Sequence, residues 1–386
     1  MHIGFITPEY PHVNTGTSGG IGTSLRNLAL ALSDLGHNVT VFVYGQPGDT
    51  GFNDNGLNII QIKNVKLKGL SWYLTRKKIQ KKINDKINNF GVQIVEAPDW
   101  MGITAFMALK CPLVIKLHGS DTFFCYLDKR PVKFMNFFFE KNALKTADAH
   151  ISVSTYVAKT TGMLFNLNLN YKIIPNGIKI PVLDGFKELQ QENKYYHTLL
   201  SVGTLIRKKG VLEIPLIFNE IIKTDRSVQL IIIGRDSYDN ITGSSSTWNL
   251  MKSLFTEVAL SKVNYIGEVS YDNLNHYYSS ADVCIYPSHA ESFGLVTIEG
   301  MSLGKPVICY DYEWTRELIS DKIDGFLIEP HNYVRFAEQV HLLLNDNELR
   351  NRIGTNARTR VIQNFSSEIV ANKTLAFYRK VIASHK

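Results

Sequence analysis

The stretch Pro-Ser-His-Ala-Glu-Ser-Phe-Gly-Leu-Val-Thr-Ile-Glu-Gly, residues 287–300, indicates both the fold and the chemistry of the chain. It follows an apolar run, Val283 to Tyr286, that predicts a buried strand. A short polar loop holds the carboxylate of Glu291, and an apolar segment with helical spacing begins at Gly294. The pattern predicts a strand, a loop and a helix, with a second carboxylate, Glu299, on the helix.

The start of such a helix is a favourable place for a phosphate group. Its free backbone N–H groups and partial positive charge attract an anion. Eight residues of helix rise about 12 Å, close to the length of a sugar joined to a nucleoside through a diphosphate. One carboxylate would then bind the sugar hydroxyls and the other the ribose hydroxyls. The bare spacing is weak by itself, because two Glu residues eight apart occur by chance in most proteins.

The composition is that of an ordinary globular protein. The chain has 386 residues, of which 44% are apolar and 20% charged, a size that suggests two domains. No apolar run is long enough to span a bilayer, and residues 1–6 predict a first strand and not a signal peptide. The four cysteines include no C-x-x-C pair, so the sequence indicates neither a zinc site nor a disulfide framework. We expect a cytoplasmic protein.

The positive charge is concentrated in one basic segment, residues 63–86. It holds nine Lys or Arg residues and one acid, Asp85, which is +8 against a net charge of +7 for the whole chain. Apolar residues, among them Trp72 and Tyr73, are interleaved with the charges. A basic amphipathic helix can lie on an anionic membrane surface, where each Lys or Arg contributes about 1 kcal/mol. Alternatively, its apolar face packs on its own domain. Nucleic acid is not expected as a partner, since no recognised binding module accompanies the segment.

Strands and helices alternate twice along the chain. The first half predicts strands at 3–7, 39–44, 94–96, 113–117 and 149–152, with helices at 24–35, around 101–109 and at 133–146. The second half predicts strands at 198–202, 229–233, 264–266, 282–286, 306–310 and 325–328, with a helix at 209–223. This alternation predicts two α/β domains, each a parallel sheet covered by helices.

The domain boundaries follow from the same pattern. We expect an N-terminal domain at 1–182, a polar linker at 183–197 and a C-terminal domain at 198–365. A last helix, at about 366–386, is expected to cross back to the N-terminal domain. Ligands of such sheets bind outside the carboxyl ends of the strands, so we expect the site in a cleft between the domains.

The second half of the chain resembles the GT4 family of retaining glycosyltransferases over most of its length. The matching residues are Ile-Pro-Asn-Gly (174–177), Val202-Gly203, Lys209-Gly210, Ile233-Gly234, 265–267, 281–283, Pro287-Ser288, Glu291 to Glu299, 304–307 and 324–327. The first half is similar more loosely, at 7–11, Gly19-Gly20, 36–39 and Leu117-His118-Gly119. The resemblance implies the GT-B fold, in which two Rossmann-like domains face each other across a cleft. It also implies a nucleotide-sugar donor in the C-terminal domain and an acceptor in the N-terminal domain.

The resemblance assigns roles to residues of the C-terminal domain. Glu291 would bind sugar hydroxyls and balance positive charge at the anomeric carbon, and Glu299 would bind ribose. Lys209 matches the diphosphate-binding lysine of the family. Arg207 would replace an Arg that many relatives carry where this chain has Thr204. The remaining expected donor contacts are Gly203, Gly234, Ser292, Phe293, Gly294 and Leu295.

Cationic side chains and backbone N–H groups are the expected means of stabilising the leaving diphosphate. The chain contains no Asp-x-Asp tripeptide of the kind that holds a metal in GT-A enzymes, so we expect neither a metal nor a cofactor. A Lys just ahead of a helix opposes the helix dipole unless an anion is present, which favours the binding role of Lys209 over a solvated helix start.

The N-terminal domain supplies the other expected contacts. Gly19 and Gly20 precede a helix and let backbone N–H groups approach a phosphate, although a plain turn is the alternative. His118 ends a strand, and the resemblance places it beside the transferred sugar as a hydroxyl contact and not a general base. Glu9, Trp100 and Arg130 are expected at the acceptor site from their positions alone.

The resemblance, together with these residues, implies a retaining, metal-independent hexosyltransferase. It would move a sugar from a nucleoside-diphosphate sugar to a glycan or lipid-linked acceptor in bacterial cell-surface polysaccharide or glycoconjugate synthesis. We expect it in the cytoplasm, including the inner face of the membrane. The alternatives are a nucleotide-sugar epimerase of GT-B fold and a non-catalytic nucleotide-sugar binder. The donor base, the sugar and the acceptor are not specified by the sequence.

Overall fold

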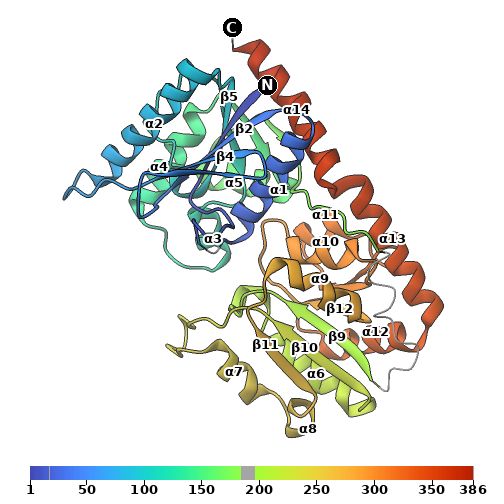
Figure 1. The fold of residues 1–386 in the computed structure, drawn as a ribbon. Coiled ribbons are helices and arrows are strands. Elements are labelled where there is room, and N and C mark those ends of the chain that lie inside the picture. The colour runs from blue at the N-terminus through green and yellow to red at the C-terminus, as the bar shows by residue number, and fades with distance from the viewer. Residues whose placement is uncertain (17, 184–195, 386) are drawn as a thin grey trace. The chain divides into compact units, whose positions relative to one another are not determined.

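The computed structural model describes residues 1–16, 18–183 and 196–385 (Figure 1). The chain divides into an N-terminal unit, Met1–Lys179 with Phe365–Lys386, and a C-terminal unit, Ile180–Asn364. Each unit is an α/β sheet whose strands are parallel apart from β3 (Gly51–Asp54), so the predicted fold class is confirmed. The predicted linker at 183–197 lies almost entirely outside the described residues. Within the ranges described, no helix is long and apolar enough to cross a membrane.

The N-terminal unit is built on an eight-stranded sheet in the order β3-β4-β2-β1-β5-β6-β7-β8. Its strands are β1 (His2–Thr7), β2 (Asn38–Tyr44), β3 (Gly51–Asp54), β4 (Leu57–Ile62), β5 (Ile94–Pro98), β6 (Leu113–Leu117), β7 (Ala149–Ser152) and β8 (Tyr171–Ile173). The antiparallel hairpin of β3 and β4 was not predicted. Asn55 and Gly56 form its two-residue turn with φ values of 51° and 88°, which is the backbone that an Asn-Gly hairpin turn requires.

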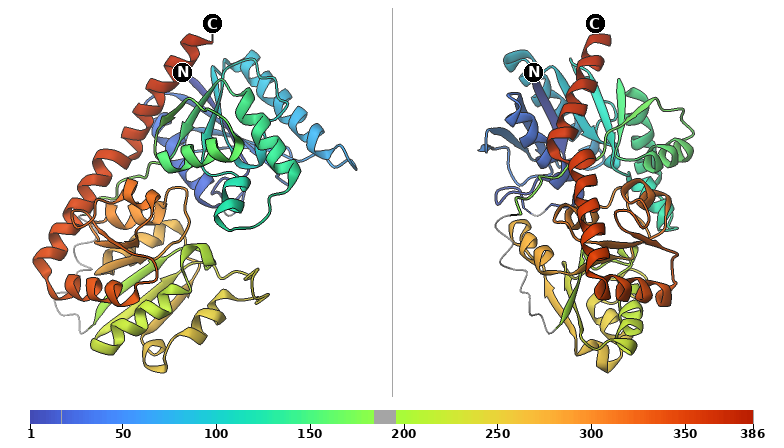
Figure 2. Two further views of the ribbon diagram at one scale, coloured as in Figure 1. Left: turned by 180° about the vertical axis from the view of Figure 1, so that it is seen from behind. Right: turned by 90° about the vertical axis from the view of Figure 1, so that its right-hand side faces the viewer.

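Helices cover both faces of this sheet. They are α1 (Gly20–Asp34), α2 (Ser71–Phe90), α3 (Asp121–Leu127), α4 (Phe134–Thr146), α5 (Thr155–Phe165) and α14 (Ser367–Ser384). Helices α1 and α14 run side by side and bury one face of the sheet together (Figure 2). Helix α2 contacts β2 from the other face. Tyr378 of α14 donates a hydrogen bond of 2.6 Å to the buried Glu96 of β5, so the last helix does belong to the N-terminal unit.

The helix predicted around 101–109 does not form. Only a 3₁₀ turn, η1 (Trp100–Gly102), is present there, and the chain continues through turns. The backbone of Gly102, at φ 53°, lies so close to α4 that an added Cβ would be 2.2 Å from the carbonyl carbon of Phe139. Met101 and Phe106 also have positive φ values, which a regular right-handed helix excludes.

The C-terminal unit has six parallel strands in the order β11-β10-β9-β12-β13-β14. The strands are β9 (His197–Val202), β10 (Val228–Ile233), β11 (Val263–Gly267), β12 (Val283–Tyr286), β13 (Val307–Tyr310) and β14 (Phe326–Ile328). The helices are η3 (Arg207–Lys209), α6 (Glu213–Thr224), α7 (Thr247–Leu254), α8 (Glu257–Leu260), α9 (Tyr271–Ser280), α10 (Leu295–Ser302), α11 (Glu313–Leu318), α12 (Tyr333–Asn345) and α13 (Asn347–Phe365).

Alternation along β12 assigns these helices to opposite faces. Val283 and Ile285 belong to the core that contains the apolar residues of α6 and α12. Cys284 and Tyr286 point the other way, where an added Cβ on Gly300 of α10 would contact both side chains. The strand is therefore buried on both sides, as its uninterrupted apolar sequence predicts.

Each sheet has one switch point, where consecutive connections leave in opposite directions. It lies between β1 and β5 in the N-terminal unit and between β9 and β12 in the C-terminal unit. Ligands of open parallel sheets bind outside the carboxyl ends of the strands at such points. The loops that follow these strands are therefore the places to look for function.

Candidate active site

A pair of opposite charges joins the two loops at the switch point of the C-terminal unit. Lys209 follows β9, Glu291 follows β12, and Lys209 Nζ donates a hydrogen bond to Glu291 Oε1. The side chains are only 24% and 11% exposed, so the pair is largely shielded from water. The structure thus brings together two predicted site residues that are 82 positions apart in the sequence.

The backbones of the two loops are also tied together. The N–H groups of His289 and Ala290 donate to the carbonyl oxygen of Lys208 at 2.9 and 3.1 Å. Gly210 has a φ of 64°, and a Cβ added to it would lie 1.7 Å from the carbonyl oxygen of Pro287. Only glycine permits this approach. The helix predicted at 209–223 consequently begins later, at Glu213, after the 3₁₀ turn η3.

Gly203 and Gly234, two predicted donor contacts, meet at the ends of β9 and β10. A Cβ on Gly234 would lie 1.9 Å from the carbonyl oxygen of Gly203, so the two backbones touch without side chains between them. Gly203 and Lys209 line a small hollow together with Tyr286 and Ser288. The backbone of Gly203 and the side chain of Lys209 therefore line the same hollow.

The start of α10 is shaped by Gly294, which caps the helix in the left-handed conformation at φ 88°. Leu295 is the first helical residue; Phe293 is buried and Ser292 half-buried in the loop before it. The helix predicted from Gly294 is confirmed to within one residue, so the residues from Glu291 to Gly294 are loop and not helix. The length of about 12 Å inferred from helical rise therefore does not apply to this pair.

Glu299 lies on α10 and is half-buried. Tyr278 of α9 directs its hydroxyl to Glu299 Oε2 at 3.2 Å. Burial raises the pKa of Glu299 to about 7. The side chain therefore changes its charge near neutral pH, a property that the sequence did not indicate.

Arg207 has a different partner from the one predicted. Its Nε and Nη2 atoms donate to the two carboxylate oxygens of Asp239 at 2.6 and 3.0 Å. Asp239 is 4% exposed, and the guanidinium holds its pKa well below the usual range. A diphosphate would have to compete with this bidentate pair for Arg207, whereas Lys209 lies at the loop contact itself.

A further carboxylate, Glu213 at the start of α6, was not predicted from the sequence. Tyr333 donates to Glu213 at 2.6 Å, and His289 Nε2 lies 3.1 Å from its other oxygen. Burial by itself would raise the pKa of Glu213, but the hydrogen bonds from His289 and Tyr333 outweigh it and lower the pKa to about 2. Glu213 thereby anchors His289, two residues before Glu291.

In the N-terminal unit, His118 follows β6 and is 7% exposed. Asp99, which follows β5, accepts hydrogen bonds from the N–H groups of His118 and Gly119 at 3.0 and 3.2 Å. Burial and the nearby Lys116 hold the pKa of His118 well below its usual range. Burial also raises the pKa of Asp99 to about 8. His118 is thus a neutral imidazole on a loop that a buried carboxyl group holds in place.

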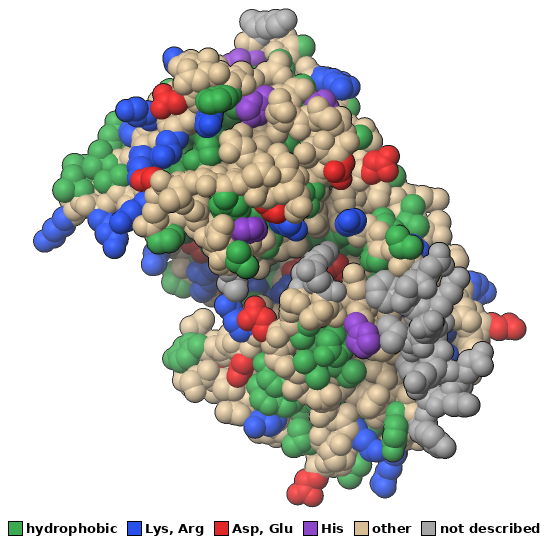
Figure 3. Space-filling model, viewed as in Figure 1, with side chains coloured by type: hydrophobic (Ala, Val, Ile, Leu, Met, Phe, Trp, Pro, Cys, Tyr) green, Lys and Arg blue, Asp and Glu red, His purple; other side chains and the backbone are tan. Residues whose placement is uncertain are grey.

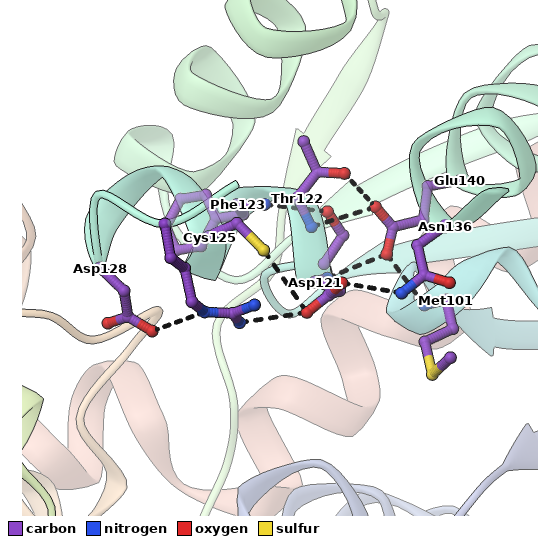
Figure 4. A network of polar contacts seen from close by, with 10 residues as sticks. Met101, Asp121, Thr122, Phe123, Cys125, Asp128, Asn136 and Glu140 are labelled. Carbon is purple, nitrogen blue, oxygen red and sulfur yellow. Dashed lines mark hydrogen bonds and ion pairs between the residues drawn. The ribbon is translucent and has the colours of Figure 1, made fainter. Parts of the chain in front are cut away.

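Glu140 of α4 orders the residues that follow this loop (Figure 4). Its carboxylate accepts from the N–H groups of Asp121 and Thr122, at the start of α3, at 2.9 and 3.2 Å. It also accepts from the Thr122 hydroxyl at 2.5 Å and from the Met101 N–H at 3.1 Å. A negative charge at a helix N-terminus is favourable, and here it connects the loops after β5 and β6. Neither Asp99 nor Glu140 was predicted.

The predicted glycine pair also lies next to a carboxylate. Gly19 caps α1 and Gly20 begins it, while Glu9 accepts a hydrogen bond of 2.9 Å from the N–H of Gly22. An added Cβ on Gly19 would be 3.3 Å from Glu9 Oε1. Glu9 therefore faces the start of α1, where the sequence predicted a phosphate.

The two other predicted acceptor residues both belong to the N-terminal unit, Trp100 to η1 and Arg130 to the connection between α3 and α4. Trp100 directly follows Asp99, and its ring centroid is 6.5 Å from that of Phe124. Arg130 is exposed and pairs with Asp121 and Asp128 at 3.1 and 3.3 Å. Both residues are linked to Glu140 through a neighbour, since Met101 follows Trp100, Asp121 pairs with Arg130, and the backbone N–H groups of Met101 and Asp121 both donate to Glu140.

Replacing Glu140 by Gln should destabilise the N-terminal unit by about 1–3 kcal/mol, because the amide nitrogen cannot accept the hydrogen bonds that one carboxylate oxygen now receives. Urea unfolding monitored in that unit measures the change in free energy. Glu348→Gln, at an exposed position of α13, is the control. Equal stability of the two variants would contradict the structural role of Glu140.

Replacing Glu213 by Gln tests the cluster in the C-terminal unit. The pKa of Glu213 in the folded chain, about 2, lies below its ordinary value of 4.5. The carboxylate therefore contributes stability above pH 4.5 that is lost as the pH falls toward 2. We expect Glu213→Gln to lose about 2 kcal/mol at pH 7 and to unfold with a weaker dependence on acid pH. Thermal unfolding at several pH values provides the measurement, and an unchanged profile would refute the assignment.

Comparison with known proteins identifies the family. The family model "Glycosyltransferase Family 4" matches residues 18–180, and "Glycosyl transferases group 1" matches residues 186–360. An uncharacterized glycosyltransferase of Methanocaldococcus jannaschii is 26% identical over 96% of this chain and 95% of its own length. The capsular polysaccharide biosynthesis glycosyltransferase CapM of Staphylococcus aureus is 30% identical over 55% of this chain and 59% of its own. The alpha-monoglucosyldiacylglycerol synthase of Streptococcus pneumoniae is 24% identical over 85% of this chain and 75% of its own length.

Solved structures agree with the fold. Sucrose-phosphate synthase from Thermosynechococcus elongatus superposes with a TM-score of 0.78 at 22% identity and covers 99% of both chains. Anabaena HepE, solved with UDP, has a TM-score of 0.74 at 19% identity and covers 98% of this chain and 100% of its own. Both likenesses concern the GT-B fold. Together, the two family models and the full-length relative show that this chain belongs to the group 1 glycosyltransferases of family GT4.

Proposed function

We propose that the protein transfers a hexose-type sugar from a nucleoside-diphosphate sugar to a glycan or lipid-linked acceptor, with retention of configuration and without a metal ion. The observation that carries this proposal is the Lys209–Glu291 pair at the switch point of the C-terminal unit. A cation and a carboxylate held side by side suit a diphosphate leaving group next to a sugar. The cation offsets charge that develops on the diphosphate, and the carboxylate faces the electron-poor anomeric carbon.

The donor would extend from this pair in both directions. The glycine backbones of Gly203 and Gly234 and the N-terminus of α10 leave room and N–H groups for phosphate oxygens. Glu299, farther along α10, would accept hydrogen bonds from ribose hydroxyls. HepE, of the same fold, has been solved with UDP and with UDP-glucose, which supports a nucleotide sugar as the donor.

His118 would contact hydroxyls of the transferred sugar. Its lowered pKa keeps the imidazole neutral, so one ring nitrogen donates a hydrogen bond and the other accepts one. The same lowering makes it a weak base at neutral pH. In a reaction on one face of the sugar, the leaving phosphate oxygen would take the acceptor's proton, and His118 would position the ring.

The acceptor class is proposed from the relatives. CapM is named for capsular polysaccharide biosynthesis, and the pneumococcal relative is named for a glucosylated diacylglycerol. Both names fit an acceptor of the cell surface that is built at the inner face of the membrane. Glu9, Trp100 and Arg130 remain the acceptor residues of this proposal.

Attraction of the basic segment 63–86 to an anionic membrane is part of the proposal. Fewer of its cations are available for a membrane than the sequence suggests. Arg76 is 6% exposed and its guanidinium lies 4.2 Å from the ring centroid of Phe139. Lys78 and Lys82 pair with Asp49 at 2.5 and 3.6 Å. The exposed cations that remain for a membrane include Lys63, Lys66, Lys68 and Lys81.

The activity is tested by incubating the full chain with a panel of nucleoside-diphosphate sugars, with and without glycan and lipid-linked acceptors. We expect release of the nucleoside diphosphate only with an acceptor, and NMR of the product should show the anomeric configuration of the donor. Epimer formation without an acceptor would favour the epimerase alternative. A product with the opposite anomeric configuration would contradict retention. Donor binding without turnover for every combination of donor and acceptor would favour the non-catalytic nucleotide-sugar binder.

Within an active donor–acceptor pair, Lys209→Met and Glu291→Gln should each lower kcat by about 100-fold or more, because each removes stabilisation from the charge-separated transition state. Lys223→Met, at an exposed position of α6, is the matched control and should leave kcat unchanged. Steady-state kinetics measure both effects. Turnover of the two site variants at the control rate would show that the pair is not the site.

The pKa of Glu299 predicts a pH dependence of donor binding. Because the raised pKa of about 7 means that the carboxyl group is protonated below neutral pH, donor affinity should fall as the pH drops from 8 to 6. The loss should approach tenfold per pH unit below about pH 7. Calorimetry with an intact nucleotide sugar suits the test, since its diphosphate does not titrate in this range. The Glu299→Gln variant should bind the donor weakly, with an affinity that does not change with pH. If its affinity fell with pH as steeply as that of the wild type, Glu299 would not be the group that causes the pH dependence.

A further inference from the structure

The N-terminal unit carries an exposed apolar surface beyond the basic segment. It is formed by the start of α2, the turn at Phe106 and the first turns of α4, and Figure 3 shows hydrophobic side chains beside Lys and Arg over the outer end of α2. We call this the aromatic surface, and it consists of Leu70, Trp72, Tyr73, Phe106, Phe134 and Phe138. Phe134 is 75% exposed, and the other five are between 37% and 50% exposed.

The rings of the aromatic surface form one continuous series of contacts, which begins with Tyr73 at 5.6 Å from Trp72. The ring centroids of Trp72 and Phe106 are 5.9 Å apart, and those of Phe106 and Phe138 are 6.0 Å apart. Phe134 stacks on Phe138 at 6.3 Å. These contacts join residues of α2 and α4 that are more than 60 positions apart in the sequence. Large apolar patches that remain exposed on a folded unit usually mark an interaction site.

A buried cation supports the patch from below. The guanidinium of Arg76 lies against the rings of Phe139 and Trp72, at 4.2 and 5.7 Å. It also donates to the carbonyl oxygens of Trp72 and Gly102, both at 3.1 Å. Arg76 thus ties the start of α2 to the η1 turn and to α4. The aromatic rings are held in place before any partner arrives.

Exposed cations flank the aromatic residues in both segments. Lys66 and Lys68 come just before Leu70, and Lys133 directly precedes Phe134. Lys77 lies 5.6 Å from the ring centroid of Tyr73. An apolar centre with Trp and Tyr and a basic border complements a bilayer surface, where aromatic rings enter the headgroup region and cations meet anionic lipids. A second copy of the chain would place the basic borders against each other.

We infer that the aromatic surface inserts into the headgroup region of an anionic lipid bilayer. This goes beyond electrostatic attraction of residues 63–86, because α4 supplies the most exposed ring and the contact is apolar at its centre. The inference holds whether or not the proposed sugar transfer is correct. It predicts binding that high salt weakens and does not abolish, since only the basic border is screened by salt.

The test uses the full chain and sedimentation with vesicles of phosphatidylglycerol and phosphatidylcholine, compared with phosphatidylcholine alone. The wild type should sediment with the anionic vesicles, and Phe134→Glu/Phe138→Glu should bind at least tenfold more weakly. The control is Ile241→Glu. Ile241 is an apolar residue of the C-terminal unit and, at 77%, is as exposed as Phe134. The control variant should bind like the wild type. Circular dichroism confirms that the variants are folded, which their exposure favours.

Three results would overturn the inference. One is unchanged vesicle binding of the double Phe variant, and another is absence of wild-type binding to anionic vesicles. The third is a dimer, seen by light scattering, that the double variant dissociates while vesicle binding stays at the wild-type level; this would assign the surface to a second copy. Nucleotide-sugar affinity, measured in the same variants without lipid, should not change, so failure of this inference is distinguishable from failure of the proposed sugar transfer.

Discussion

The backbone contact between Gly210 and Pro287 is the constraint on which the candidate donor site depends. It exists because Gly210 has no Cβ at a point where one would overlap the carbonyl oxygen of Pro287. The contact brings the loop after β9 against the loop after β12, and it thereby places Lys209 beside Glu291. Two charges at the carboxyl ends of adjacent central strands lie at the switch point, where an open parallel sheet offers its binding position.

Buried or half-buried carboxyl groups perform a corresponding task in both units. Glu213 holds His289 in the loop that carries Glu291, and Asp99 holds the backbone of His118 and Gly119. Glu140 continues the support to the start of α3. In each case the carboxyl group accepts hydrogen bonds from backbone or side-chain donors of the loop that carries the proposed site residue. Such support keeps a loop in one conformation, as a site that stabilises charge requires.

The sequence predicted the layout of the sheets well and the contacts within the site poorly. Strand and helix alternation predicted both parallel sheets, because hydrophobic periodicity is a local property. The short hairpin of β3 and β4 was missed although Asn55-Gly56 signals it. The length argument from Glu291 to Glu299 failed because it applied the rise of a helix to residues 291–294, which precede α10. No local pattern could indicate that Arg207 pairs with Asp239, or that Asp99 accepts a hydrogen bond from the backbone of His118. These contacts join segments that are distant in the sequence.

The central claim is that a nucleotide sugar binds where the loops after β9 and β12 meet. Hydrogen–deuterium exchange of the full chain, with and without a nucleoside-diphosphate sugar, tests this most directly because it needs no substitution and no acceptor. The account predicts slower exchange of backbone amides in residues 203–210 and 288–299 when the donor is present. Unchanged exchange in both segments at a saturating donor concentration would contradict it.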